Sequence, residues 1–180
     1  MTLSELRARL RAELGDETTG AYVWSDALLD GFLGDATERL GEDLPLEKEA
    51  QLTPNPDGAY ALPSDLLRLR YVATGGAALG SGEYTAWGGT LRLASPTSSE
   101  VSVRYAGARA RPPASGDAGL LAGETPPVLW LAAASAMGWL GKQREKAGAA
   151  SSGAVAAAYG RRYEEWLRAR RRPLRRVAAL

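Results

Sequence analysis

The sequence predicts an α+β fold that is mainly helical, with about four helices and a small antiparallel β insertion in its middle third. Leucines recur at helical spacing over the first part of the chain, whereas apolar and polar residues alternate over much of residues 46–105. A long, nearly uncharged helical pattern then begins near residue 125, and an arginine-rich helix follows it. Because 180 residues are enough for one sizeable core, we expect residues 1–180 to form a single domain.

Residues 1–45 are predicted to form an N-terminal helical hairpin. The first helix begins with a capping box from Thr2 to Glu5 and stops at Gly15, a residue type that suits the left-handed position after a helix. The second helix has Ser25 as its N-cap, and Pro45 ends it. The apolar stripes of these helices contain Leu3, Leu6, Leu10, Leu14, Leu29, Phe32, Leu33, Ala36 and Leu40.

The β-rich insertion is predicted to span residues 46–105. Segments 46–52 and 59–62 have a period of two and flank a run of turn residues, so we expect them to pair as a hairpin. Residues 62–67 are expected to form a single helical turn. Further strands are expected at residues 69–72, 84–87, 90–94 and 100–105.

Two glycine-containing segments lie within this insertion. Gly88 and Gly89 predict a tight turn between two of the expected strands. The glycines of residues 75–82 do not open a helix, so neither their spacing nor their context matches a dinucleotide site. We interpret them as a mobile hairpin loop, with a binding loop as the alternative.

Residues 125–172 are predicted to form two C-terminal helices after a flexible linker at 106–124. Thr125 is predicted to cap the first helix. Pro126 and Pro127 suit its first positions, because the N–H groups that prolines lack would have no partner in the first turn. This helix is apolar almost all round, so we expect it to be central. A membrane span is the alternative, but an uncharged run of about 17 residues is at the short limit for one, and we expect no membrane contact.

The faces of this first C-terminal helix predict two different contacts. One face should pack inside the subunit, and it contains Val128, Leu131, Ala132, Ser135, Ala136, Trp139 and Leu140. The opposite face is rich in small residues that allow close approach of a neighbour or of another subunit. We expect a homo-oligomer, with the subunit-interface candidates Trp130, Met137, Gly138 and Gly141.

The C-terminal end is the basic end of the chain. Residues 1–160 carry 14 basic and 19 acidic groups, whereas residues 161–180 carry 8 arginines and 2 glutamates. The last helix has a stripe of Val155, Tyr159, Tyr163 and Trp166, and a basic tail at 173–180 follows it. The tail has an apolar side, which favours docking to a protein over electrostatic binding to nucleic acid. The predicted docking residues are Trp166, Arg168, Arg170, Arg171, Arg172, Leu174, Arg175, Arg176, Val177 and Leu180.

The absence of His and Cys argues against an enzyme. These residues supply most general bases near neutral pH, most zinc ligands and the commonest soft nucleophiles. A Walker A loop and a nucleophile elbow are also missing, so we expect no catalytic residue, no cofactor and no metal. The acidic side chains of Asp26, Asp30, Asp35 and Glu38 are interpreted as a solvated helix face rather than as a metal or acid/base site.

Three short motifs in a fixed order resemble the head-to-tail adaptor, or connector, proteins of tailed bacteriophages. They are the leucines Leu3, Leu6 and Leu10, the run Trp24-Ser25-Asp26-Ala27-Leu28-Leu29, and the run Tyr60-Ala61-Leu62-Pro63-Ser64-Asp65-Leu66-Leu67-Arg68. Two C-terminal helices fit the same pattern, and the likeness in the order of elements covers nearly the whole chain. The glycine-rich loop at 75–82 is a departure to which we assign no role.

The resemblance implies a structural protein made in the host cytoplasm and placed at the head–tail junction of the virion. Such adaptors form a ring, usually of twelve subunits, beneath the portal protein, and DNA passes through the channel without sequence-specific binding. The resemblance assigns residues 168–180 to portal docking and the opposite end to tail or tail-completion proteins. The alternative is a nucleic-acid-binding protein that uses the arginine-rich C-terminal helix and tail.

Overall fold

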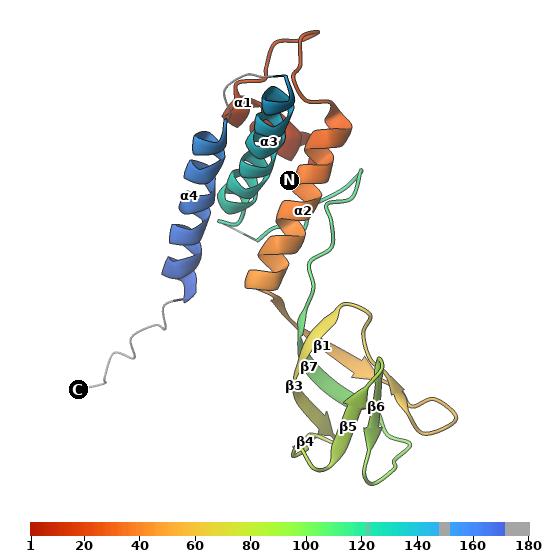
Figure 1. Cartoon of the computed structure of the whole chain (residues 1–180). Helices are drawn as coiled ribbons and strands as arrows, with labels where there is room; N and C mark the ends of the chain where they lie inside the picture. The colour runs from red at the N-terminus through yellow and green to blue at the C-terminus, as the bar shows by residue number, and fades with distance from the viewer. Residues whose placement is uncertain (122, 148–151, 172–180) are drawn as a thin grey trace, which may run out of the picture. The chain divides into compact units, whose positions relative to one another are not determined.

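The computed structural model describes residues 1–121, 123–147 and 152–171 of the chain. The chain forms two compact units, a helical unit of Met1–Asp43 and Ala110–Leu180 and a β unit of Leu44–Arg109. Four helices and antiparallel sheets make an α+β fold, as the sequence predicts (Figure 1). The expectation of a single domain over residues 1–180 stays a prediction, and each unit is described by itself.

The helical unit is built around one central helix. Its elements are α1 (Leu3–Leu14), α2 (Asp26–Asp43), α3 (Thr125–Lys146) and α4 (Gly153–Arg171). α3 packs against each of the other three helices, so the prediction that it is central is confirmed (Figure 1). Within the described residues, no helix has the length and apolar character needed to cross a membrane.

The ends of α1 and α2 are fixed by the local sequence. Thr2 Oγ1 accepts a hydrogen bond from the Glu5 amide (3.2 Å), and the Glu5 carboxylate accepts one from the Thr2 amide (2.8 Å). Gly15 ends α1 in the left-handed region with φ 66°. Ser25 Oγ accepts from the Leu28 amide (3.3 Å) at the start of α2. The predicted capping residues of both helices are therefore confirmed.

Leucines from the two predicted stripes form much of the helical core. Leu14 and Phe32 are half-buried, whereas the other leucines of the stripes are buried. From α3, Val128, Ala132 and Ala136 have no exposed surface. The fully buried leucines are Leu6, Leu10, Leu29, Leu33 and Leu40.

Two details of α3 differ from the sequence prediction. Its N-cap is Glu124 rather than Thr125, and the Glu124 carboxylate accepts a hydrogen bond from the Leu121 amide (2.8 Å). Thr125 thus lies inside the first turn together with the two prolines. Ser135, which was placed on the packed face, is exposed, in keeping with the cost of burying a hydroxyl.

The buried stripe of α4 is rotated relative to the prediction. Tyr163 and Leu167 are buried, but Val155 is 45% exposed and Trp166 is half-buried. At 3.6 residues per turn, Val155 lies about 80° around the helix from Tyr163, whereas Leu167 lies about 40° from it. Of the four residues of the predicted stripe, only Tyr163 is buried, and Leu167 completes the buried side of the helix.

The β unit contains two antiparallel sheets that share one hydrophobic core. The first has the order β1-β7-β3-β4 and the second has the order β2-β6-β5. Tyr60 and Leu91 of the second sheet belong to the same core cluster as Val72, Val101 and Val103 of the first. The strands are β1 (Leu46–Leu52), β2 (Tyr60–Ala61), β3 (Leu66–Thr74), β4 (Ala77–Ala78), β5 (Tyr84–Trp87), β6 (Thr90–Leu93) and β7 (Val101–Gly107).

The predicted hairpin of 46–52 with 59–62 is wrong. β1 pairs along its whole length with β7, from Leu46 opposite Gly107 to Leu52 opposite Val101, while β2 pairs with β6. The two segments keep a single bridge, between Pro54 and Tyr60. The distant pairing wins because it offers seven ladder positions, whereas β2 contains two residues before Pro63 interrupts the strand pattern.

The predicted helical turn at 62–67 is also wrong. The chain makes one turn, closed by a hydrogen bond from the Leu66 amide to the Pro63 carbonyl (3.1 Å), and enters β3 at once. Asp65 in this turn binds Lys48 Nζ (2.5 Å) and the Tyr105 hydroxyl (3.2 Å). These contacts to β1 and β7 hold the turn against the first sheet.

The two ends of the β unit are tied to each other. Arg109, at its C-terminal boundary, is 7% exposed. Its Nε and Nη2 donate to the carbonyl of Leu44, at the N-terminal boundary, at 3.3 and 3.2 Å. The insertion therefore begins and ends at adjacent points.

Candidate functional site

The described end of α4 places the predicted docking residues in different environments. The Trp166 ring stacks on that of Tyr163, with centroids 6.3 Å apart, and the Arg170 guanidinium lies 5.1 Å from the Trp166 centroid. Arg168 is exposed. The remaining docking candidates, Arg172, Leu174, Arg175, Arg176, Val177 and Leu180, lie outside the described residues.

Asp43, the last residue of α2, binds several side chains near this end of α4. The Tyr163 hydroxyl donates to Asp43 Oδ2 (2.7 Å), and Arg171 Nη2 donates to Asp43 Oδ1 (2.8 Å). Arg39 lies 3.1 Å from the same carboxylate, whose charge raises the pKa of Arg39. Arg171 is therefore bound to the chain itself, and the last turn of α4 is anchored to α2.

Tyr163 is the buried member of this cluster. Burial, and then the hydrogen bond to Asp43 and its charge, raise the pKa of Tyr163 well above its ordinary value. The hydroxyl therefore stays protonated near neutral pH and remains a donor to Asp43. This contact ties α4 to the end of α2.

The four subunit-interface candidates on α3 are not equally available to a partner. Trp130, Met137 and Gly138 are half-buried, whereas Gly141 is buried within the chain. A Cβ atom added to Gly138 would meet no other atom within 4 Å. The small size of Gly138 is thus not needed for packing in the single chain.

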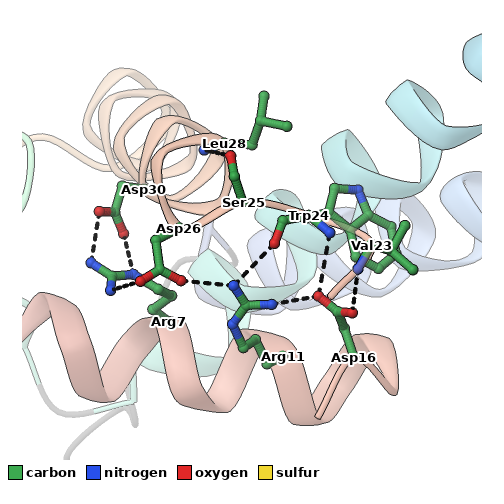
Figure 2. Close-up of polar contacts among 9 residues, drawn as sticks. All are labelled: Arg7, Arg11, Asp16, Val23, Trp24, Ser25, Asp26, Leu28 and Asp30. Atoms are coloured by element: carbon green, nitrogen blue, oxygen red, sulfur yellow. Dashed lines mark hydrogen bonds and ion pairs between the residues drawn. The ribbon is translucent and has the colours of Figure 1, made fainter. Parts of the chain in front are cut away.

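Arginines from α1 hold the acidic start of α2 (Figure 2). Arg7 contacts Asp26 and Asp30, each at 2.7 Å. Arg11 contacts Asp26 Oδ1 at 2.7 Å and Asp16 Oδ2 at 2.5 Å. The hydrogen bond from Arg11 lowers the pKa of the Asp26 carboxyl, with the charges of Arg11 and Arg7 adding to the effect.

The second acidic pair of α2 is also held by an arginine. Arg111 contacts Asp35 at 2.6 Å and Glu38 at 2.7 Å. Asp26, Asp35 and Glu38 are exposed, as the predicted solvated face requires, and Asp30 is half-buried. The carboxylates join α2 to α1 and to the segment that precedes α3, and they bind guanidinium groups.

The most exposed large apolar side chain among the described residues is Trp87, at 90%. It ends β5 directly before Gly88 and Gly89, whose φ values of 58° and 76° make the tight turn that the sequence predicts. Thr85 and Trp87 lie opposite Arg92 and Thr90 of β6 and are exposed, whereas Leu91 is fully buried. Trp87 therefore stands on the solvent face of the β5–β6 hairpin.

Sequence reasoning did not single out Trp87, Asp43 or Arg11. For Trp87 a usable pattern exists, because alternation with Tyr84 and Ala86 puts Thr85 and Trp87 on the same face of the strand. Together with the two-glycine turn that follows it, this alternation predicts that Trp87 is an exposed aromatic residue at the tip of a hairpin. The roles of Asp43 and Arg11 depend on helices meeting in space, which spacing along the chain does not give.

The chain matches a known protein family over almost its whole length. The family model described as SU10 adaptor protein matches residues 1–178. The chain belongs to the SU10 adaptor protein family. The resemblance to phage head–tail adaptors is thereby confirmed, and the SU10 adaptor family makes this chain a structural protein of bacteriophage assembly and a virion component. Such a protein interacts with portal or tail proteins. No curated protein matches the chain.

Proposed function

We propose that this SU10 adaptor is a non-enzymatic subunit of a ring at the head–tail junction, between the portal protein and the tail proteins. The ring contains twelve subunits, and DNA passes through its centre without sequence-specific binding. The observation that carries the proposal is the family match over residues 1–178.

The portal contact is assigned to the end of α4 and the basic tail. Tyr163 and Arg171 bind Asp43, so the last turn of α4 is held and can direct the following residues toward one partner. Arg168 is exposed and offers its charge outward. An acidic surface on the portal is the complement that these arginines require.

The subunit contact is assigned to the side of α3 that carries Trp130, Met137 and Gly138. Open space beside Gly138 permits a neighbouring backbone to approach closely. Gly141 is buried in the single chain and contributes to such a contact only through the packing of α3. Half-buried Trp130 offers an aromatic anchor of the type enriched at interfaces.

Binding to the purified portal tests the proposal. The full chain and a variant that ends at residue 171 are mixed with portal, separated by sedimentation, and inspected by electron microscopy. We expect the full chain to form rings on the portal and the shortened chain to bind at least about tenfold more weakly. A chain that stays monomeric and does not bind portal would contradict the adaptor role.

Nucleic-acid binding remains the alternative, and salt dependence separates it from the adaptor role. Exposed Arg161, Arg162 and Arg168 on α4 favour it, although Arg162 lies 3.5 Å from Glu13 within the chain. DNA binding through these arginines would weaken steeply as salt is raised. We expect DNA affinity to be weak and to be the same for the full and shortened chains.

A further inference from the structure

Trp87 protrudes from the β5–β6 hairpin. Tryptophan is highly buried on average in folded proteins, yet this ring is 90% exposed. The tight turn at Gly88 and Gly89 fixes the strand end that carries it. Hollows of about 410 and 350 Å³ lie on its two sides, so the side chain stands clear of its neighbours.

A hollow of matching chemistry lies at the other end of the same hairpin. It has a volume of about 290 Å³, and its lining combines the apolar Leu79, Leu93, Ala94 and Pro96 with the polar Thr74, Glu83, Ser95 and Thr97. An apolar cavity of about 150 Å³ accepts benzene, so a hollow of 290 Å³ has room for an indole ring. Glu83 on its wall supplies a carboxylate whose Oε2 already accepts from the Gly80 amide (2.6 Å), so its Oε1 would be the acceptor for the indole N–H.

The Trp87 ring cannot fill the hollow of its own chain. Glu83 and Trp87 are four strand positions apart, which is roughly 13 Å at the rise of an antiparallel strand. Both features belong to the β unit, so their separation is fixed within one compact body. A protruding side chain and a hollow at opposite ends of one hairpin can pair only between copies, and repeated head-to-tail contacts of this kind close into a ring where the rotation between neighbours allows it.

We infer that Trp87 of one copy inserts into the Leu79–Leu93–Pro96 hollow of a second copy of this chain. This inference rests on the proposed ring and names a contact within it. The contact is heterologous, because the two partners use different surfaces. Burial of an exposed tryptophan supplies the main favourable term, as is usual for aromatic anchors at interfaces.

Self-association of the full chain tests the contact. Trp87→Ala removes the protruding ring, and Ala94→Trp fills the hollow at an exposed position. We expect each substitution to lower the association constant measured by sedimentation equilibrium at least about tenfold. Leu67→Ala is the matched control, since Leu67 is an exposed apolar residue of the same unit that does not line the hollow. If both variants associate as the unmodified chain does, the inference is wrong.

Cross-linking tests which residues lie at the contact. Because the sequence contains no cysteine, only the introduced cysteines can react. Thr90→Cys and Ala94→Cys chains, which keep Trp87, are treated with a short bismaleimide after circular dichroism has shown that each is folded; Thr90 lies directly opposite Trp87. We expect a mixture of the two single variants to give mixed dimers and the double variant to give a ladder of oligomers. Dimers of the Thr90→Cys variant alone, or monomers throughout, would overturn the inference.

Portal binding, measured in parallel, separates this inference from the proposed function. Portal binding without a ladder would refute the Trp87 contact and leave the adaptor role standing. A ladder without portal binding would support the contact between copies and refute the adaptor role.

Discussion

Arg11 connects α1, α2 and the loop between them. Its guanidinium binds Asp16, Asp26 and the Trp24 carbonyl, and it lies 3.8 Å from the centre of the Tyr22 ring. The side chains of Arg11 and Asp16 are only 9% and 3% exposed. Each charge in such a pair depends on the other, because an unpaired buried charge is costly.

Substitution of Arg11 should therefore destabilise the helical unit. We expect Arg11→Met to lower the free energy of unfolding by about 3 kcal/mol, because Asp16 would be left buried without its partner. Arg9→Met, at an exposed position of the same helix, should change it by less than about 0.5 kcal/mol. Urea denaturation of both variants measures the difference, and equal stabilities would contradict the role of Arg11.

Asp65 should contribute to the acid sensitivity of the β unit. The hydrogen bond from Lys48 lowers the pKa of the Asp65 carboxyl. A lowered folded-state pKa gives stability that is present above the unfolded pKa and is lost as the pH falls through the folded pKa. We expect Asp65→Asn to lose less unfolding free energy than the unmodified chain between about pH 5 and about pH 2.

The control for Asp65→Asn is Asp57→Asn, which removes an exposed acid of the same unit. Its unfolding free energy should follow that of the unmodified chain over the same pH range. Denaturant melts at each pH supply the measurement. If the unfolding free energy of Asp65→Asn fell as steeply with falling pH as that of the unmodified chain, Lys48 would not be stabilising the charged carboxyl.

At the scale of elements, α3 carries a glycine that the single chain does not require. Because a Cβ at Gly138 would meet nothing within 4 Å, Gly138→Ala should stabilise the monomer by about 0.5–1 kcal/mol through helix propensity. Gly160→Ala on α4 has the same open surroundings and is the control. If α3 forms the subunit contact, Gly138→Ala alone should also weaken assembly, which sedimentation would detect.

Elements that depend on local chemistry were predictable, and long-range pairings were not. The caps at Thr2, Gly15 and Ser25 were found because their hydrogen bonds stay within one turn. The partner of β1 could not be found in this way, because β7 begins about fifty residues later and the nearby turn favoured a hairpin. A single alternating pattern predicts a strand but does not select its neighbour.

The same division applies to the candidate site. Trp166 and Arg170 were identified from the charge and position of the last helix, and they do interact. Asp43, which binds Tyr163 and Arg171, lies more than one hundred residues earlier, so only the folded structure reveals these contacts. The ion pairs of Asp26, Asp30, Asp35 and Glu38 were missed for the same reason.

For the whole molecule, we expect stability and portal binding to respond differently to loss of the tail. Ending the chain at residue 171 keeps Tyr163 and Arg171, which fix α4 to Asp43. The thermal midpoint of the shortened chain should therefore stay within a few degrees of that of the full chain. Differential scanning calorimetry measures this, and a large drop would mean that the weaker portal binding reflects unfolding.

The bond from Arg109 to the Leu44 carbonyl has a consequence for modularity. Because the chain leaves the helical unit and returns to it at neighbouring points, the β unit occupies the place of a surface loop. Loops of this kind tolerate exchange for any folded segment whose own ends lie close together. We therefore expect the helical unit to keep its fold when residues 44–109 are replaced by another domain whose ends lie close together.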